Sequence, residues 1–300
     1  MSRKILVPLD GSQLAEAAVS LAVAMAKGTA ARLCLCHIEQ AGPIARAQLP
    51  AAGRYLDGIA DSAAGDLNES VDTAVVHDGN GYASKHGTAA RIAKYAEEHA
   101  FDLIVLSTRG HSGLKRLFEG SVAEALLRVT PCPVLFCGPR VGERMMKPGP
   151  HPIRKLLVAL DQTETSEDVL ASAVGYAGEL NAEVTLLHVL QPMRAFATVT
   201  GVELAGYSAE QWAEFRTRAD EYLAGIRQRL AVTGIPMTSE VVVSNDAAEA
   251  ILDAAARWNA DIIALASRAP QRLVRSLFGS VGDRVVRAAP CPVLVTRAKA

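Results

Sequence analysis

The chain repeats itself with a period of about 150 residues. Residues 3–10 (RKILVPLD) return as 154–161 (RKLLVALD), a shift of 151 positions. Residues 101–136 return without a gap as 260–295, and fifteen of those 36 aligned pairs are identical. Solenoid repeats have periods of about 20–50 residues, so this longer period indicates a duplicated domain. Differences between the copies then indicate which copy keeps a function.

The composition of the chain limits the kinds of partner that we expect it to bind. The 300 residues include 31 basic and 32 acidic side chains, for a net charge of −1. This balance gives no electrostatic reason to expect a nucleic acid or an anionic membrane as partner. The N-terminal apolar run is too short for a signal peptide, and no stretch approaches the ~20 apolar residues of a membrane span. We therefore expect a soluble, cytoplasmic protein.

The cysteines favour a structural role. There are five, an odd number, at positions 34, 36, 132, 137 and 291. No CxxC motif is present, and no Cys/His spacing suits zinc. We expect reduced, buried thiols that pack as small apolar residues, and no metal site.

Apolar runs alternate with helical stretches in both copies. Residues 4–9 and 155–160 are too short for helices and rich in Ile, Leu and Val, which predicts strands buried on both faces. Second strands end at His37 and His188. The remaining expected strands are 71–76, 102–107, 133–136, 239–243, 261–266 and 292–296, and the expected helices are 14–27, 88–99, 120–129, 166–180, 247–258 and 279–288.

This alternation predicts an α/β fold. Strands separated by helices of 10–15 residues indicate right-handed βαβ crossovers and a doubly wound, mostly parallel sheet, with five strands in each copy. Residues 139–153 contain Pro and Gly without periodicity and mark a linker. We therefore expect a first copy at 1–138 and a second copy at 154–300.

The copies differ in length at two places. The second copy has 16 more residues between its second and third strands, which we assign in part to a longer helix near 208–231 with a core-facing or subunit-facing apolar stripe. The first copy has eight more residues after its third strand, in the loop 77–87. This loop is expected to cover the ligand side of the sheet, and a metal site at His77, Asp78 and His86 is the less favoured interpretation because no further ligand has a defined spacing.

The residues after the first and fourth strands point to a binding site. Ligands of open parallel sheets bind outside the carboxyl ends of the strands, where the strand order reverses. Asp10 follows the first strand and Ser107 ends the fourth. Gly120 and Ser121 open a helix, whose free N–H groups and dipole favour phosphate. A tight turn followed by an N-cap explains the same glycines and serines, so spacing leaves both interpretations open.

The chain resembles the universal stress protein family over both copies, from Ile5–Asp10 to Pro131–Leu135. ATP-binding members of that family carry G-x2-G-x9-G-[ST] after the fourth strand. The first copy reads Ser107-x2-Gly110-x9-Gly120-Ser121, with serine in place of the first glycine. The resemblance implies a fold like that of the adenine-nucleotide alpha hydrolases. It also implies that the last strands of the two copies pair into an internal pseudo-dimer.

The resemblance also implies a nucleotide site in the first copy, for ATP with Mg²⁺ as a candidate companion ion. Asp10 would meet the ribose or adenosine, and the adenine would be framed by Pro8, Leu9 and Ile38. The ribose and phosphates would be held by Gly110, Gly120, Ser121 and Val122. Further candidates in the same loop are Ser107, Arg109 and Gly113. Arg109 could reach a phosphate, but a charged side chain commonly lies on a solvated face, and Arg109 recurs as Arg268 in the second copy.

The second copy departs further from the family pattern. It reads Ala266-x2-Ala269-x9-Gly279-Ser280, with Pro270 after Ala269. Pro270 lacks a backbone N–H and restricts the residue before it. We expect the second copy to bind nucleotide poorly or not at all and to act as scaffold. His37 and His188 recur at matching strand ends, which favours a structural role for both.

The expected function is that of a stress-response or signalling protein regulated by ATP in the first copy. A slow ATPase is an alternative, but the sequence contains no Walker lysine and no carboxylate pair at a useful spacing. An interaction module that binds no nucleotide is the other alternative. Self-association into a homodimer is expected because most soluble oligomers are closed and symmetric. The sequence names no protein partner.

Overall fold

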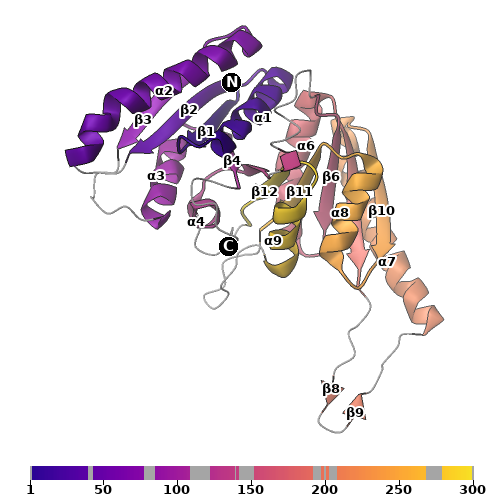
Figure 1. The fold of residues 1–300 in the computed structure, drawn as a ribbon. Helices are drawn as coiled ribbons and strands as arrows, with labels where there is room; N and C mark the ends of the chain where they lie inside the picture. The colour runs from indigo at the N-terminus through magenta and orange to yellow at the C-terminus, as the bar shows by residue number, and fades with distance from the viewer. Residues whose placement is uncertain are drawn as a thin grey trace.

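The computed structural model describes residues 2–39, 43–77, 85–108, 122–138, 140–141, 152–191, 197–198, 201–202, 208–267 and 279–298. Within these ranges, ten strands form one continuous sheet that runs through both copies (Figure 1). The strand order is β10-β7-β6-β11-β12-β5-β4-β1-β2-β3.

The elements follow the expected alternation. The first copy contains β1 (Lys4–Leu9), α1 (Gln13–Thr29), β2 (Arg32–Glu39), α2 (Pro43–Leu67), β3 (Asp72–His77), α3 (Lys85–Glu98), β4 (Leu103–Ser107), α4 (Val122–Val129) and β5 (Val134–Cys137). The second copy contains β6 (Lys155–Leu160), α6 (Glu164–Leu180), β7 (Glu183–Leu190), β8 (Ala197–Thr198), β9 (Gly201–Val202), α7 (Ala209–Leu230), η1 (Ala231–Thr233), β10 (Met237–Val243), α8 (Ala247–Trp258), β11 (Ile262–Ala266), α9 (Gly279–Ala288) and β12 (Val293–Thr296).

Each copy contributes five parallel strands, and the two halves meet at their last strands. β5 and β12 pair antiparallel, with Leu135 opposite Leu294 at the centre of three pairs. Both leucines are buried, at 0% and 1% exposure, so the seam lies in the core of the molecule. This confirms the doubly wound α/β fold and the pairing of the two last strands within one chain.

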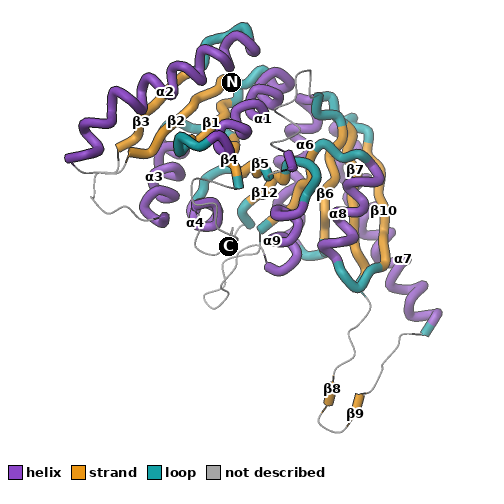
Figure 2. Tube along the Cα trace, viewed as in Figure 1, coloured by secondary structure: helices purple, strands orange, loops and turns teal. Residues whose placement is uncertain are grey.

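The sheet is covered by helices on both faces (Figure 2). Helices α1, α2, α6 and α7 pack on one face, and α3, α4, α8 and α9 on the other. Successive strand residues point to opposite faces. Ile5 and Val7 accordingly join the first core, whereas Leu6 joins the second. The continuous apolar run of β1 is therefore required by burial on both sides, as the sequence predicted.

One expectation about length is wrong. Helix α2 of the first copy has 25 residues and α7 of the second has 22, so the extra residues of the second copy do not lengthen its helix. Three positions separate β2 from α2, whereas eighteen separate β7 from α7 and include the β8–β9 pair. Pro50 and the glycines at 53, 58 and 65 weaken the helical signal of α2 in the sequence. Burial of Leu56, Ala60 and Ala63 at helical spacing outweighs that low propensity.

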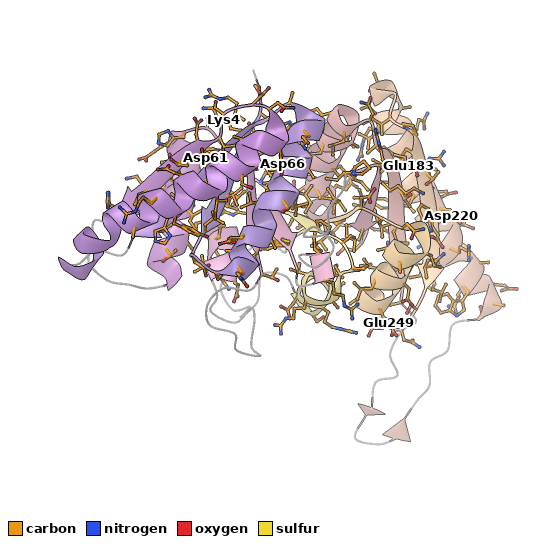
Figure 3. The ribbon with its side chains drawn as sticks, turned by 45° about the horizontal axis from the view of Figure 1, so that its top comes forward. Lys4, Asp61, Asp66, Glu183, Asp220 and Glu249 are labelled. Carbon is orange, nitrogen blue, oxygen red and sulfur yellow. The ribbon has the colours of Figure 1, made fainter. Side chains whose placement is uncertain are left out.

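Charged side chains lie on the outer surfaces of the helices. Figure 3 labels Asp61 and Asp66 on α2, Asp220 on α7 and Glu249 on α8, all of which are exposed. In the described part of the chain, no helix combines the length and the apolar character needed to cross a bilayer.

Candidate functional site

The carboxyl ends of β1 and β4 separate at the point where the strand order reverses. The ladder between β1 and β2 contains six pairs and extends to Leu9 opposite His37. The ladder between β1 and β4 contains two pairs and stops at Leu6 opposite Ile104. Beyond Leu6 the two strand ends are therefore not joined by ladder pairs, which is the feature that opens binding crevices in doubly wound sheets. The predicted site lies at this edge.

Asp10 organises the turn that leads from β1 into α1. Its Oδ1 accepts hydrogen bonds from the backbone N–H and the hydroxyl of Ser12, at 3.0 and 2.6 Å. The hydroxyl oxygen of Ser12 accepts in turn from the N–H of Ala15 at 3.2 Å and caps α1. Asp161 and Thr163 repeat this arrangement in the second copy. The turn thus accounts for an aspartate in both copies, so Asp10 does not distinguish them.

The structure brings part of the predicted set together at this edge. Pro8 and Leu9 are buried at the end of β1, and Ile38 is half-buried on the neighbouring strand. Ser107 is half-buried opposite Cys137 at the end of β4, and Val122 begins α4. Outside the described residues lie Arg109, Gly110, Gly113, Gly120 and Ser121, together with 78–84 of the expected lid and metal loop.

The two matching histidines make the same structural hydrogen bond. His37 Nδ1 lies 2.9 Å from the carbonyl oxygen of Leu9, and His188 Nδ1 lies 2.8 Å from that of Leu160. A carbonyl oxygen only accepts, so Nδ1 must carry the ring proton in both copies. The predicted structural role is confirmed for this nitrogen, because it ties the second strand of each copy to the first.

The residue that follows Asp10 differs between the two copies, and this difference is not among the sequence predictions. Gly11 has φ 82° and its counterpart Gln162 has φ 66°, so both turns use the left-handed conformation that glycine adopts without strain. The Gln162 side-chain nitrogen lies 3.1 Å from His188 Nε2. His188 is only 7% exposed, whereas His37 is half-buried. The shift of 151 positions between the copies aligns Gly11 with Gln162, so this difference can be found by comparing the two repeats.

A tyrosine on the long helix reaches the first helix of each copy near this edge. The Tyr55 hydroxyl donates to Glu16 Oε1 at 3.2 Å. Burial and then the Glu16 carboxylate raise the pKa of Tyr55, and burial and then Glu167 raise the pKa of Tyr222 in the second copy. Both phenols therefore stay neutral. In the second copy the buried Tyr222 hydroxyl has no hydrogen-bond partner among the described residues, so only the placement of the tyrosine near the first helix recurs. We interpret this placement as packing between the helices rather than as ligand recognition.

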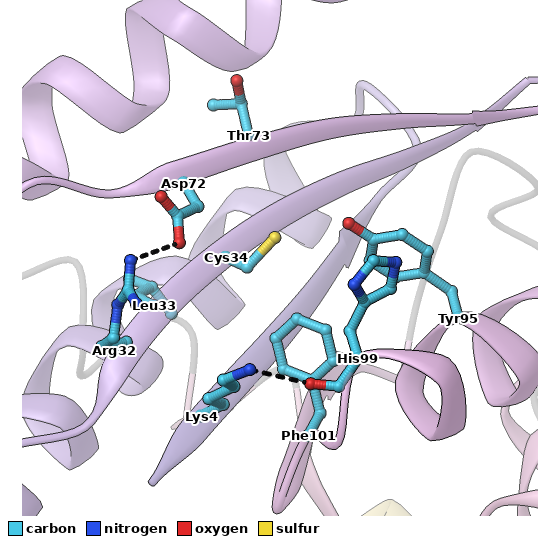
Figure 4. Close-up of a pocket in the computed structure, with 9 residues that line it drawn as sticks. All are labelled: Lys4, Arg32, Leu33, Cys34, Asp72, Thr73, Tyr95, His99 and Phe101. Carbon is cyan, nitrogen blue, oxygen red and sulfur yellow. Dashed lines mark hydrogen bonds and ion pairs between the residues drawn. The ribbon is translucent and has the colours of Figure 1, made fainter. Parts of the chain in front are cut away.

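A cavity of about 290 Å³ lies at the opposite edge of the first copy (Figure 4). Its walls come from the amino ends of β1, β2 and β3 and from the end of α3 and the residues after it: Lys4, Arg32, Leu33, Cys34, Asp72, Thr73, Tyr95, His99 and Phe101. Lys4 Nζ donates to the carbonyl oxygen of His99 at 3.0 Å, as cations commonly do at a helix C-terminus. This cavity is separate from the predicted site, because parallel strands carry Lys4 and Leu9 to opposite edges.

Titratable side chains do not gather into a metal site in the described ranges, where no group of three or more His, Cys, Asp or Glu residues could hold an ion.

Comparisons with known proteins point to one family. The model of the universal stress protein family matches residues 1–138 and again 152–297. A universal stress protein of Mycobacterium bovis is 30% identical over 198 residues, which cover 65% of this chain and 62% of that protein. A universal stress protein of Synechocystis is 27% identical over 150 residues, which cover 48% of this chain and 97% of that protein.

Solved structures show the same fold over the whole chain. The crystal structure of a universal stress protein from Archaeoglobus fulgidus superposes with a TM-score of 0.66 at 18% identity and covers 99% of this chain and 97% of its own. A protein of unknown function from Pseudomonas aeruginosa superposes with a TM-score of 0.59 at 19% identity, with 99% and 93% covered. With two family matches that together span both copies, the chain belongs to the universal stress protein family.

Proposed function

We propose that the first copy binds an adenine nucleotide, ATP in particular, as a regulatory ligand, and that the second copy acts mainly as scaffold. Family membership supports this proposal, together with the glycine pattern at Gly110, Gly120 and Ser121 that resembles ATP-binding members. The location that we propose for the site is the edge where β1 and β4 separate, beyond their last ladder pair. We propose the boundaries 1–138 and 154–300 for the two domains, and a cytoplasmic protein that forms homodimers.

One observation leads us to assign the nucleotide to the first copy rather than the second. The first copy has Gly11 at the position where the second copy has Gln162. In the second copy, the Gln162 side chain is hydrogen-bonded to His188 at the carboxyl edge of the sheet. In the first copy, Gly11 places no side chain there. A ligand of the second copy would have to displace a hydrogen-bonded amide, whereas a ligand of the first would not.

The test is to denature freshly purified protein, identify any released nucleotide by chromatography and measure its amount per chain. The proposal predicts about one adenine nucleotide per chain, or saturable uptake of one added ATP with Mg²⁺. Gly120→Val should abolish binding, because its Cβ and branches would block the approach of a phosphate to backbone N–H groups. Gly279→Val at the matching position of the second copy is the control and should leave binding unchanged.

Other outcomes decide among the alternatives. Two nucleotides per chain would show that the second copy also binds. No nucleotide, even after ATP and Mg²⁺ are added, would leave the interaction module as the function. Conversion of bound ATP to ADP, lost in the Gly120→Val variant, would establish the slow ATPase.

A further inference from the structure

The cavity at the amino edge of the first copy (the amino-edge cavity, Figure 4) carries two cations on neighbouring strands. Lys4 and Arg32 are partners in the parallel ladder between β1 and β2, and both line the cavity together with Asp72. In the second copy, the matching ladder partners are Lys155 and Glu183, which form an ion pair at 3.4 Å. Like charges on adjacent strands repel each other. An anion bound at the amino-edge cavity would offset this repulsion.

Both cations keep hydrogen-bond donors for a ligand. Among the described residues, the three N–H donors of the Lys4 ammonium meet one acceptor, the carbonyl oxygen of His99 at 3.0 Å. In the same part of the chain, the five donors of the Arg32 guanidinium meet one carboxylate oxygen, Asp72 Oδ2, at 3.3 Å. The Arg32 side chain is 61% exposed, so this ion pair is weak. A carboxylate can therefore take up donors of both cations without breaking a strong contact.

The floor of the cavity is aromatic and uncharged. The rings of Tyr95 and Phe101 lie with their centres 5.9 Å apart and are half-buried against the core of this face. Beside them is the thiol of Cys34, which stays neutral because burial raises its pKa to about 11. Half-buried rings offer a ligand a flat apolar surface for stacked or edge-to-face contact. The second copy has Ala254 and Ala260 in place of the two rings, at the shift of 159 positions.

We propose that the amino-edge cavity is a second ligand site, which binds a small aromatic carboxylate. The carboxylate accepts hydrogen bonds from Lys4 and Arg32, and the ring of the ligand lies against Tyr95 and Phe101. The volume of about 290 Å³ is at the lower end of the range for ligand pockets, which keeps the ligand small. This site lies at the opposite edge of the sheet from the proposed nucleotide site, so the two proposals stand independently.

The test uses benzoate as the probe, titrated into the full chain and followed by saturation-transfer NMR of the ligand signals. Benzamide has nearly the same shape without the charge, and acetate has the charge without the ring. Benzoate should bind saturably with a Kd of about 1 mM or tighter, as fits a ligand of so few atoms. It should bind at least about tenfold more tightly than benzamide or acetate, because each of these lacks one of the two kinds of contact.

Variants that introduce the residues of the second copy locate the site. Arg32→Glu places a carboxylate beside Lys4, as Glu183 lies beside its lysine in the second copy, and should weaken benzoate binding by at least about tenfold. Phe101→Ala removes one ring of the floor and should weaken benzoate binding severalfold. Glu183→Gln is the matched control in the second copy and should leave benzoate binding unchanged.

Circular dichroism checks that each variant is folded. If Arg32→Glu does not fold, Arg32→Gln and the comparison of benzoate with benzamide on the wild-type protein decide. No saturable binding of benzoate, equal binding of benzoate and benzamide, or an unchanged benzoate affinity in the folded Arg32 variant would each overturn the proposal. Gly120→Val should leave benzoate binding intact. Loss of benzoate binding in that variant would assign the probe to the nucleotide site and would also overturn the proposal.

Discussion

Burial favours the neutral form of four thiols, those of Cys34, Cys36, Cys132 and Cys137. All five cysteines are buried and none forms a disulfide, as the sequence predicted. Burial raises the pKa of Cys34 to about 11 and that of Cys132 and Cys137 to about 12. Because the thiolate is the nucleophile, these side chains are inert at neutral pH. The Cys34 thiol in the wall of the amino-edge cavity is therefore a packing group.

We predict that a thiol-specific dye does not label the native protein at neutral or mildly alkaline pH and labels five thiols after denaturation. The raised pKa values also affect stability. Thiols of the unfolded chain ionise near pH 8.5, before those of the folded chain, so this contribution is full below about pH 8 and is lost as pH rises toward the folded values. Rapid labelling of native protein would show that one of these thiols reaches solvent.

At the scale of the elements, the polar turn between the first strand and the first helix stabilises each copy separately. The Ser12 hydroxyl donates to Asp10 and accepts from the N–H of Ala15, and Thr163 makes the equivalent bonds in the second copy. The cap thus joins a strand end to a helix start. The same turn borders the proposed nucleotide site in the first copy only.

Ser12→Ala should lower the free energy of unfolding by about 1–2 kcal/mol, because one helix N–H and one carboxylate lose their hydroxyl partner. Thr163→Ala is the matched change and should cost a similar amount. Urea unfolding followed by circular dichroism measures both. If the free energy of unfolding of the Ser12 variant equals that of the wild type within error, water replaces the cap. Nucleotide affinity should fall only in the Ser12 variant.

At the scale of the whole molecule, an asymmetric contact joins the two copies beside the β5–β12 seam. Arg3 Nε donates to both carboxylate oxygens of Glu179, at 2.6 and 2.7 Å. The guanidinium also lies 4.5 Å from the ring centre of Tyr176, whose hydroxyl donates to the carbonyl oxygen of Asp102. The residue that matches Glu179 in the first copy is Gly28, where a Cβ would meet Leu180 at 2.3 Å. The two copies therefore contribute different side chains to this contact.

A double-mutant cycle of Arg3→Met and Glu179→Gln should give a coupling energy of about 0.5–1 kcal/mol, since the pair is about one-third exposed. The coupling should decrease as salt is added. Arg154→Met is the control, because Arg154 matches Arg3 in the second copy but donates to the Leu180 carbonyl oxygen. It should show no coupling with Glu179. A coupling of zero between Arg3 and Glu179 would assign the orientation of the copies to apolar packing alone.

The sequence alone determined the repeated α/β architecture, and it predicted the edge of the sheet at which we propose the nucleotide site. Strand and helix periods are local properties, so runs such as 4–9 and the end of β1 at Leu9 are readable without coordinates. Helix α2 was not predicted, because its internal proline and glycines lower its helix propensity. In the folded protein, burial of Leu56 and its neighbours stabilises the helix.

Only the tertiary structure decided which side chains meet across the chain. Gln162 and His188 are 26 positions apart, and Arg3 and Glu179 are 176 apart, so no local pattern relates them. Each pair forms because the parallel ladder or the β5–β12 seam brings distant segments into register. Hydrogen bonds depend on distances of about 3 Å and on direction, which packing sets and periodicity does not. For that reason the repeat revealed two copies with different glycine patterns, and the tertiary structure revealed the side-chain contacts in which they differ.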